Sequence, residues 1–247
     1  MLGILGIGMA LVVIGRGINL SLVATMAMTV AWTLALVAKF HTAFTPIVIG
    51  ISFASAIGIG SGLIIAYVEI PAIFATLAMG TLIYGIGRFK LIDLDVVYVP
   101  ANAGWIKVFG AEDVLGVPTP VLFFSGVALI AHGFLRHTKI GKFIYAEGDN
   151  YVAARITGIP VRPMIVLQYL LSSLIGFVAG MVTAASVASM NTRIVNSTLI
   201  YDVILVVVLG GVGLSGGKGG VRNVVVGTLL IGILLNGMTI LDVQYTV

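Results

Sequence analysis

Uninterrupted apolar runs, each about 15 to 25 residues long, recur along nearly the whole chain. The first of them, "LGILGIGMALVVIG", contains no charged residue. Strands of a membrane barrel would instead alternate apolar and polar residues over about ten positions. Hydrophobic residues make up 60% of the chain and charged residues 9%, against about 45–50% and about 25% in a soluble domain. The sequence therefore predicts an all-α, polytopic bundle of transmembrane helices.

About eight apolar segments fit such a bundle, because a straight crossing needs about 20 residues. They lie at about 1–15, 19–38, 44–67, 72–87, 117–135, 164–188, 201–217 and 223–241. The segments 1–15, 72–87 and 201–217 are short, so we expect them to be clipped, broken or partly re-entrant. We expect the whole of 1–247 to form a single transmembrane domain.

Orientation follows from the loop 136–163, which is the most basic loop of the chain. Lys and Arg collect in cytoplasmic loops, so this loop is expected in the cytoplasm. Counting crossings outward from it places Arg16 and the 218–222 turn on the same side. The 88–116 loop then lies outside, and Lys39 is the exception, since the alternation puts this basic residue outside as well.

The densest glycine cluster is "GGVGLSGGKGG", residues 210–220. Three of its glycines fit the G-x-G-x-x-G spacing of dinucleotide sites, but two apolar helices flank it where that site needs a strand and a helix. A P-loop does not fit either, because Gly219 stands where a Ser or Thr should bind the metal. We expect no cofactor on this chain and an irregular structural turn, formed by Gly210, Gly211, Gly213, Gly216 and Gly217.

Two other glycine pairs lie within predicted spans. Gly58 with Gly62, and Gly176 with Gly180, have the G-x-x-x-G spacing that places both glycines on one helix face. Such a face lets two helix backbones approach closely. These pairs predict tight helix packing.

Within the basic loop, "YAEGDNYVAARITGIPVRP" carries the start and stop signals of a short helix. Asp149 or Asn150 fits the N-cap, and Gly158 fits the left-handed stop. Val152 and Ile156 then lie one turn apart on one side. A helix of about two turns is unstable alone, so it needs a partner surface. That surface is either the protein's own helices or a groove on a cytoplasmic protein.

The stretch "YAEGDNYVAARITGIPV" resembles the cytoplasmic coupling motif of the ribose-type sugar permeases of bacterial ABC importers. The glycine-rich turn with the helix after it resembles the late signature of that family, and "GIGMALVVIGRGINLSL" resembles its early turn. These three motifs stand in order from residue 6 to 240 and cover essentially the whole chain. Arg16, Asn19 and Leu22 depart from the usual pattern of the early turn. The residues at recurrent positions of that coupling motif are Tyr145, Gly148, Asn150, Ala153, Ala154, Arg155, Gly158 and Ile159. Together with Asp149, Val152 and Ile156, which the helix pattern singles out, they are the residues assigned to ATPase coupling.

The resemblance implies a permease subunit that moves a small sugar, a ribose-like monosaccharide or a polyol, into the cytoplasm by alternating access. The implied partners are a second permease chain, a cytoplasmic ATPase that carries ATP and Mg, a periplasmic or extracellular sugar-binding protein, and lipid of the bacterial cytoplasmic membrane. Nucleic acid is not expected as a partner. Family members carry further helices before and after this region, which agrees with an apolar run that begins at Met1.

Four polar residues within the apolar background are candidates for the translocation pathway: Asn19, Ser21, Asp202 and Asn236. Each has a structural alternative, since Asp202 can act as a helix cap and the others can bridge helices. A permease for nucleosides or another small solute remains an alternative reading, as does an ion-coupled secondary transporter. That transporter would need buried charged relays, and an enzyme would need converging acids or metal ligands. Neither pattern is evident, so no catalytic or metal-binding residue is expected.

Overall fold

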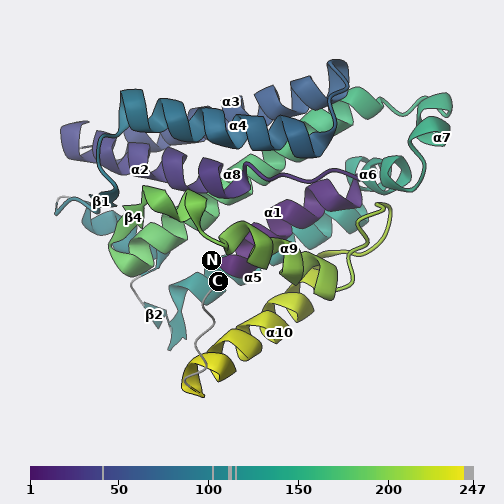
Figure 1. Cartoon of the computed structure of the whole chain (residues 1–247). Helices are drawn as coiled ribbons and strands as arrows, with labels where there is room; N and C mark the ends of the chain where they lie inside the picture. The colour runs from purple at the N-terminus through teal and green to yellow at the C-terminus, as the bar shows by residue number, and fades with distance from the viewer. Residues whose placement is uncertain (41, 102, 111–112, 115, 242–247) are drawn as a thin grey trace.

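A computed structural model describes residues 1–40, 42–101, 103–110, 113–114 and 116–241 of the chain. Long helices lie side by side and form most of the molecule (Figure 1). Among the described residues, six helical segments are long and apolar enough to cross a membrane; α4 is one of them when the π-helical turn that continues it, Gly87–Leu91, is included. They are α2 (Leu22–Phe40), α3 (Phe44–Tyr67), α4 (Ala72–Ile86), α5 (Thr119–His137), α8 (Val161–Val187) and α10 (Val221–Ile240).

Two further apolar helices, α1 (Leu2–Ile14) and α9 (Leu199–Leu209), are too short to cross alone. At a rise of about 1.5 Å per residue they extend about 20 Å and about 16 Å, against a hydrocarbon core of about 30 Å. The predicted count of about eight spans is therefore wrong, whereas the expected shortness of 1–15 and 201–217 is confirmed. The segment 72–87, also expected to be short, continues to Leu91 and is long enough to cross. Both apolar segments, 1–15 and 201–217, contain a helix. The helix in the second segment ends at Leu209, directly before the glycine-rich turn.

Helix α8 lies at the centre and packs against α1, α2 and α3. Its contact with α3 depends on small residues, as the G-x-x-x-G spacing predicts. A Cβ at Gly58 would lie 2.7 Å from Leu170 Cα, and one at Gly62 would lie 2.6 Å from Val166 Cα. The predicted close packing of this pair is confirmed, because no larger side chain fits between the two backbones.

The two ends of the bundle differ in structure. At one end lie α6 (Lys139–Asp149) and α7 (Tyr151–Ile156), with the turns that follow α1 and α9 (Figure 1). We call this the basic end, because it carries Arg16, Arg136, Lys139, Lys142, Arg155, Arg162, Lys218 and Arg222. At the other end, the strand end, β1 (Val96–Tyr98) pairs antiparallel with β4 (Ser189–Asn191), so that Val97 faces Met190. The short strands β2 (Asp113–Val114) and β3 (Val117–Pro118) form a second pair.

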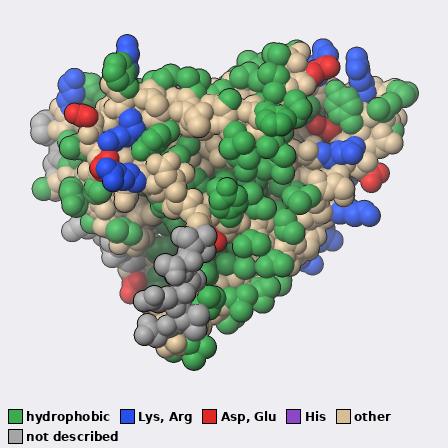
Figure 2. Space-filling view, viewed as in Figure 1, with side chains coloured by type: hydrophobic (Ala, Val, Ile, Leu, Met, Phe, Trp, Pro, Cys, Tyr) green, Lys and Arg blue, Asp and Glu red, His purple; other side chains and the backbone are tan. Residues whose placement is uncertain are grey.

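A belt of apolar side chains lies between the charged ends (Figure 2). Leu129 and Ile130 of α5 are 73% and 75% exposed, and Ile233 of α10 is 71% exposed. Exposure of this apolar surface to water would be unfavourable, whereas its contact with lipid is favourable. The belt therefore marks the part of the molecule that faces the bilayer.

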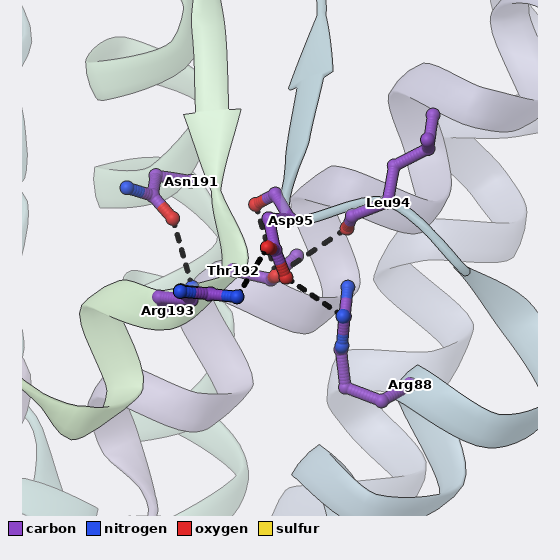
Figure 3. A network of polar contacts seen from close by, with 6 residues as sticks. All are labelled: Arg88, Leu94, Asp95, Asn191, Thr192 and Arg193. Carbon is purple, nitrogen blue, oxygen red and sulfur yellow. Dashed lines mark hydrogen bonds and ion pairs between the residues drawn. The ribbon is translucent and has the colours of Figure 1, made fainter.

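An ion network holds the strand end together, as the close-up shows (Figure 3). The carboxylate of Asp95 pairs with Arg88 at 2.7 Å and with Arg193 at 2.6 Å. The backbone N–H and the hydroxyl of Thr192 donate to the Asp95 carbonyl at 2.8 and 3.0 Å. Asp95 thereby fixes the 3-10 helix η3 (Thr192–Asn196), which leads into α9, against the segment that follows α4.

Candidate functional site

The turn between α1 and α2, Gly15–Ser21, is irregular backbone that runs from the exposed Arg16 at the basic end to the buried Asn19 and Ser21; we call it the early turn. Arg16 adopts a left-handed φ of 67°, which ends α1. Side chains from two other helices satisfy the backbone that this ending leaves free. Leu20 N donates to Thr76 Oγ1 of α4 at 3.1 Å, and Tyr169 OH of α8 donates to Ile18 O at 3.2 Å.

Asn19 and Ser21, two of the predicted pathway residues, are fully buried within the early turn. Asn19 Nδ2 donates to Ser172 Oγ of α8 at 3.0 Å, and Ser21 Oγ donates to Asn19 Oδ1 at 2.7 Å. In this conformation the two side chains join the early turn to α8 and line neither of the two cavities described below. Their role in translocation stays a prediction.

Two cavities lie on opposite sides of the early turn. The outer cavity, of about 410 Å³, is lined by Leu20 and by the α4 residues Leu77, Gly80, Thr81 and Tyr84. Its other wall is formed by 195–197 and 200–201, and its polar groups come from Thr81, Tyr84, Asn196, Ser197 and Tyr201. Sequence reasoning missed these residues, because single hydroxyl and amide groups near span ends are ordinary in any membrane helix.

The inner cavity, of about 200 Å³, is lined by Gly15, Arg16 and Gly17 of the early turn and by Pro71 and Ala72 at the start of α4. The remaining polar lining comes from Glu147, Tyr151, Gln168 and Tyr169. Thr76, which contacts the early turn, lies along α4 between the parts of that helix that line the two cavities. The early turn therefore separates the outer cavity from the inner cavity.

The other two predicted pathway residues lie elsewhere. Asp202 is in the first turn of α9 and is half-buried. Within the described residues its carboxylate makes no hydrogen bond or ion pair, whereas the neighbouring Tyr201 lines the outer cavity. Asn236 is exposed on α10. The structure thus does not bring the four residues together, and neither of the two cavities is lined by any of them.

The predicted short helix in the basic loop is α7. Of the two candidate N-cap residues, Asn150 is the one that caps it. Asn150 Oδ1 accepts from Ala153 N at 3.0 Å. Gly158 follows with a left-handed φ of 84°, as the stop signal predicts. Val152 and Ile156 are 64% and 80% exposed, so this pair forms an apolar surface that no part of the described chain covers.

The helix α6, which precedes α7, was not predicted separately from the loop. A start signal for it is present, since Thr138 Oγ1 accepts from Gly141 N at 3.0 Å in the N-cap geometry. Two residues assigned to coupling, Tyr145 and Gly148, lie on α6 and face the protein instead of a partner. Ala154 of α7 is also buried. The assigned coupling residues thus divide into an exposed set and a set that contacts the bundle.

The glycine-rich turn packs directly against α6. Tyr145 OH donates to Gly219 O at 2.8 Å, and Gly217 N donates to Ile14 O, at the end of α1, at 2.8 Å. Gly148 lies in the same contact, because a Cβ there would strike Ile14 O. The early turn, α6 and the glycine-rich turn, far apart in sequence, therefore meet at the basic end.

The need for glycine in this turn has two physical causes. Gly211, Gly216 and Gly217 have φ values of 92°, 82° and 68°, which other residues adopt at a cost of roughly 1–2 kcal/mol. A Cβ at Gly217 would also lie 2.8 Å from Asp149 Cα. Gly210 is held by Asn223 Nδ2, which donates to its carbonyl at 2.8 Å. The glycines thus serve backbone conformation and close packing, whereas a Cβ at Gly213 would make only ordinary contacts, 3.6 Å from Ser215 Oγ.

One buried acid at the basic end was missed by sequence reasoning. Glu147 of α6 is 2% exposed and accepts a hydrogen bond from Gln168 Nε2 of α8 at 2.9 Å. Burial raises the pKa of this carboxyl to about 8, although the hydrogen bond from Gln168 acts in the opposite direction. Its loop position gave no sign of burial, because α6 itself was not predicted.

The fold defines a multi-pass helical membrane protein, and residues of the early turn line a cavity on each side of it. Residues 1–246 match the family described as branched-chain amino acid transport system / permease component, and the chain belongs to that family. It is thus a transport permease component.

Several curated relatives match over nearly the whole chain. The ribose import permease protein RbsC of Escherichia coli (strain K12) is 34% identical over 250 residues, which cover 98% of this chain and 75% of the relative. The galactofuranose transporter permease protein YtfT of the same strain is 35% identical, covering 95% of this chain and 69% of the relative. The D-allose transport system permease protein AlsC is 29% identical, covering 98% and 73%. No solved structure matches the chain.

Proposed function

We propose that this chain is the membrane subunit of an ATP-binding-cassette importer that moves a small monosaccharide into the cytoplasm. The observation that carries the proposal is the early turn, whose residues line an outer cavity and an inner cavity, and which directly follows Ile14, the residue that α6 contacts through Gly148. A transporter by alternating access needs a barrier of this kind, open to one side at a time.

The sugar substrate is supported by the relatives and by the lining of the outer cavity. The relatives named above are permeases for ribose, galactofuranose and D-allose. The hydroxyl groups of Thr81, Tyr84, Ser197 and Tyr201 line the outer cavity, together with Asn196. Such groups exchange hydrogen bonds with a polyhydroxylated solute without binding it tightly. Specificity would then be set mainly by an external sugar-binding protein.

The energy would come from ATP, with Mg, on a separate cytoplasmic ATPase. The basic end faces the cytoplasm in this proposal, as the distribution of Lys and Arg favours. The apolar pair Val152 and Ile156 projects from that end and fits helix-in-groove docking on the ATPase. A second permease chain would complete the assembly.

Charged substitution of the exposed pair tests the docking surface. Val152→Glu with Ile156→Glu should lower ATP-dependent sugar uptake at least about tenfold, because two carboxylates would have to be buried in an apolar groove. Uptake would be measured with radiolabelled ribose in proteoliposomes that contain the full-length permease, its ATPase and its sugar-binding protein.

Leu94→Glu is the matched control. Leu94 is 62% exposed and apolar, but it lies at the strand end, so this variant should transport normally. If the double variant takes up sugar at the wild-type rate, Val152 and Ile156 do not form the docking surface. If the assembled importer takes up a nucleoside and no sugar, the proposed docking surface stands and the proposed substrate is wrong.

A further inference from the structure

Glu147 is the only carboxyl group among the described residues that is almost completely buried. It lies on the face of α6 that is turned toward α8, and Gln168, its hydrogen-bond partner, is 1% exposed. No Lys or Arg lies within ion-pair distance of it in the described part of the chain. A buried ionised carboxylate with one neutral partner is strongly unfavourable, so the neutral acid fits this conformation.

The charged and titratable groups around Glu147 do not change this conclusion. Arg16 lines the same cavity without forming an ion pair with it, and Asp149, further along α6, is exposed. Glu69, beside the cavity, is already paired with Arg162 at 2.9 Å. Tyr151 and Tyr169 line the same cavity, and Tyr145 and Lys218 lie on α6 and on the glycine-rich turn. Lys139 and Lys142 of α6 and Arg155 of α7 are exposed.

The partner of Glu147 belongs to the same stretch of α8 that holds the early turn. The Gln168 side chain packs directly on Gly15, where a Cβ would strike it. The next residue, Tyr169, donates to Ile18 O, and Ser172, one turn on, accepts from Asn19. One hydrogen bond therefore separates Glu147 from the residues that hold the early turn in place.

We propose that Glu147 is a positioning residue for coupled transport: its neutral carboxyl group attaches α6 to Gln168, so that a displacement of α6 by the ATPase moves the early turn. This inference rests on the proposed function and deepens it. Gln168 also donates to the ionised carboxylate, but one neutral donor does not offset the cost of burying that charge. Ionisation of Glu147 therefore favours separation of α6 from α8, which lets water reach the carboxylate. The raised pKa of Glu147, about 8, agrees with this pH dependence, since the carboxyl group is mostly neutral at pH 7 and mostly ionised above about pH 8.

The test compares Glu147→Gln with Glu147→Ala in proteoliposomes that contain the full-length permease, its ATPase and its sugar-binding protein. The measured quantity is the number of ATP molecules hydrolysed per sugar transported, at several pH values on both sides of about 8. In the wild type this number should rise as pH passes about 8, because coupling is lost as Glu147 ionises.

Glu147→Gln keeps a neutral hydrogen-bonding group, so it should keep wild-type coupling and lose the pH dependence. Glu147→Ala should hydrolyse ATP while transporting at least about fivefold less sugar per ATP at every pH, which is the lower range of measured coupling effects. Unchanged coupling in Glu147→Ala, or a pH dependence that survives in Glu147→Gln, would overturn the inference.

If Glu147→Ala does not assemble, the pH comparison of wild type and Glu147→Gln decides alone, since neither protein lacks a hydrogen-bonding group at this position. Failure of the proposed function gives a different result. The wild type would then show no ATP-dependent sugar uptake at any pH, whereas failure of the inference alone leaves wild-type uptake intact.

Discussion

At the scale of single residues, the polar side chains of this protein are mostly paired inside the bundle. Three side chains from other helices form hydrogen bonds with the early turn: Thr76 of α4, and Tyr169 and Ser172 of α8. Sequence alone identified Asn19 and Ser21 as notable but could not distinguish a pathway from a bridge, because the distinction depends on which helices surround them. It missed Glu147 for the same reason.

The buried acid predicts a pH dependence of stability. Its carboxyl keeps its proton in the folded protein up to about pH 8, whereas in the unfolded chain it loses the proton near 4.5. Stability should therefore fall as pH rises from about 4.5 to about 8, and level off above that range. The measurement is the thermal midpoint of the detergent-solubilised protein against pH. In Glu147→Gln this fall should be reduced; an identical profile in both proteins would contradict the buried acid.

Asp95 predicts a local stabilisation at the strand end. Asp95→Asn removes the charge that pairs with both Arg88 and Arg193, and should lower the free energy of unfolding by about 1 kcal/mol, since the carboxylate is partly exposed to solvent. Asp93→Asn is the control, because Asp93 is exposed and forms no ion pair within the described chain. Equal thermal midpoints for the two variants would show that the network contributes nothing.

At the scale of elements, sequence periodicity predicted the long spans well. The expected segment 44–67 coincides with α3, Phe44–Tyr67, because composition and length alone define a lipid-facing helix. The segment 201–217 was expected to be clipped or broken, and its helix does end at Leu209. Apolar residues between the glycines keep the hydropathy of its second half high, although that half is not helical. The division of the basic loop into α6 and α7 also escaped prediction, because packing on the glycine-rich turn stabilises α6.

The contact between α6 and the glycine-rich turn predicts different tolerance at neighbouring glycines. Gly217→Ala combines a left-handed φ with a Cβ 2.8 Å from Asp149 Cα, so it should lower the free energy of unfolding by at least roughly 1–2 kcal/mol and reduce transport. Gly213→Ala should be tolerated, since its Cβ would meet no atom closer than 3.6 Å. Thermal midpoints and uptake measure both effects. Equal tolerance at the two positions would refute the packing argument.

At the scale of the whole molecule, the chain forms a lipid-facing bundle whose interior barrier is a short stretch of irregular backbone. The outer cavity and the inner cavity approach that barrier from opposite sides. The barrier is held by α8 and α4, and α8 is in turn attached to α6 at the basic end. Under the proposed function, motion applied to α6 and α7 by the ATPase would therefore reach the early turn through direct contacts.

The most direct test of this account is the accessibility of the two cavities during the ATP cycle. The chain contains no cysteine, so Ser197→Cys in the outer cavity and Ile70→Cys in the inner cavity give single reporters for a hydrophilic thiol reagent. When ATP is added to the assembled importer, the labelling rates at the two positions should change in opposite directions. Rates that stay constant, or that rise together, would contradict a barrier at the early turn.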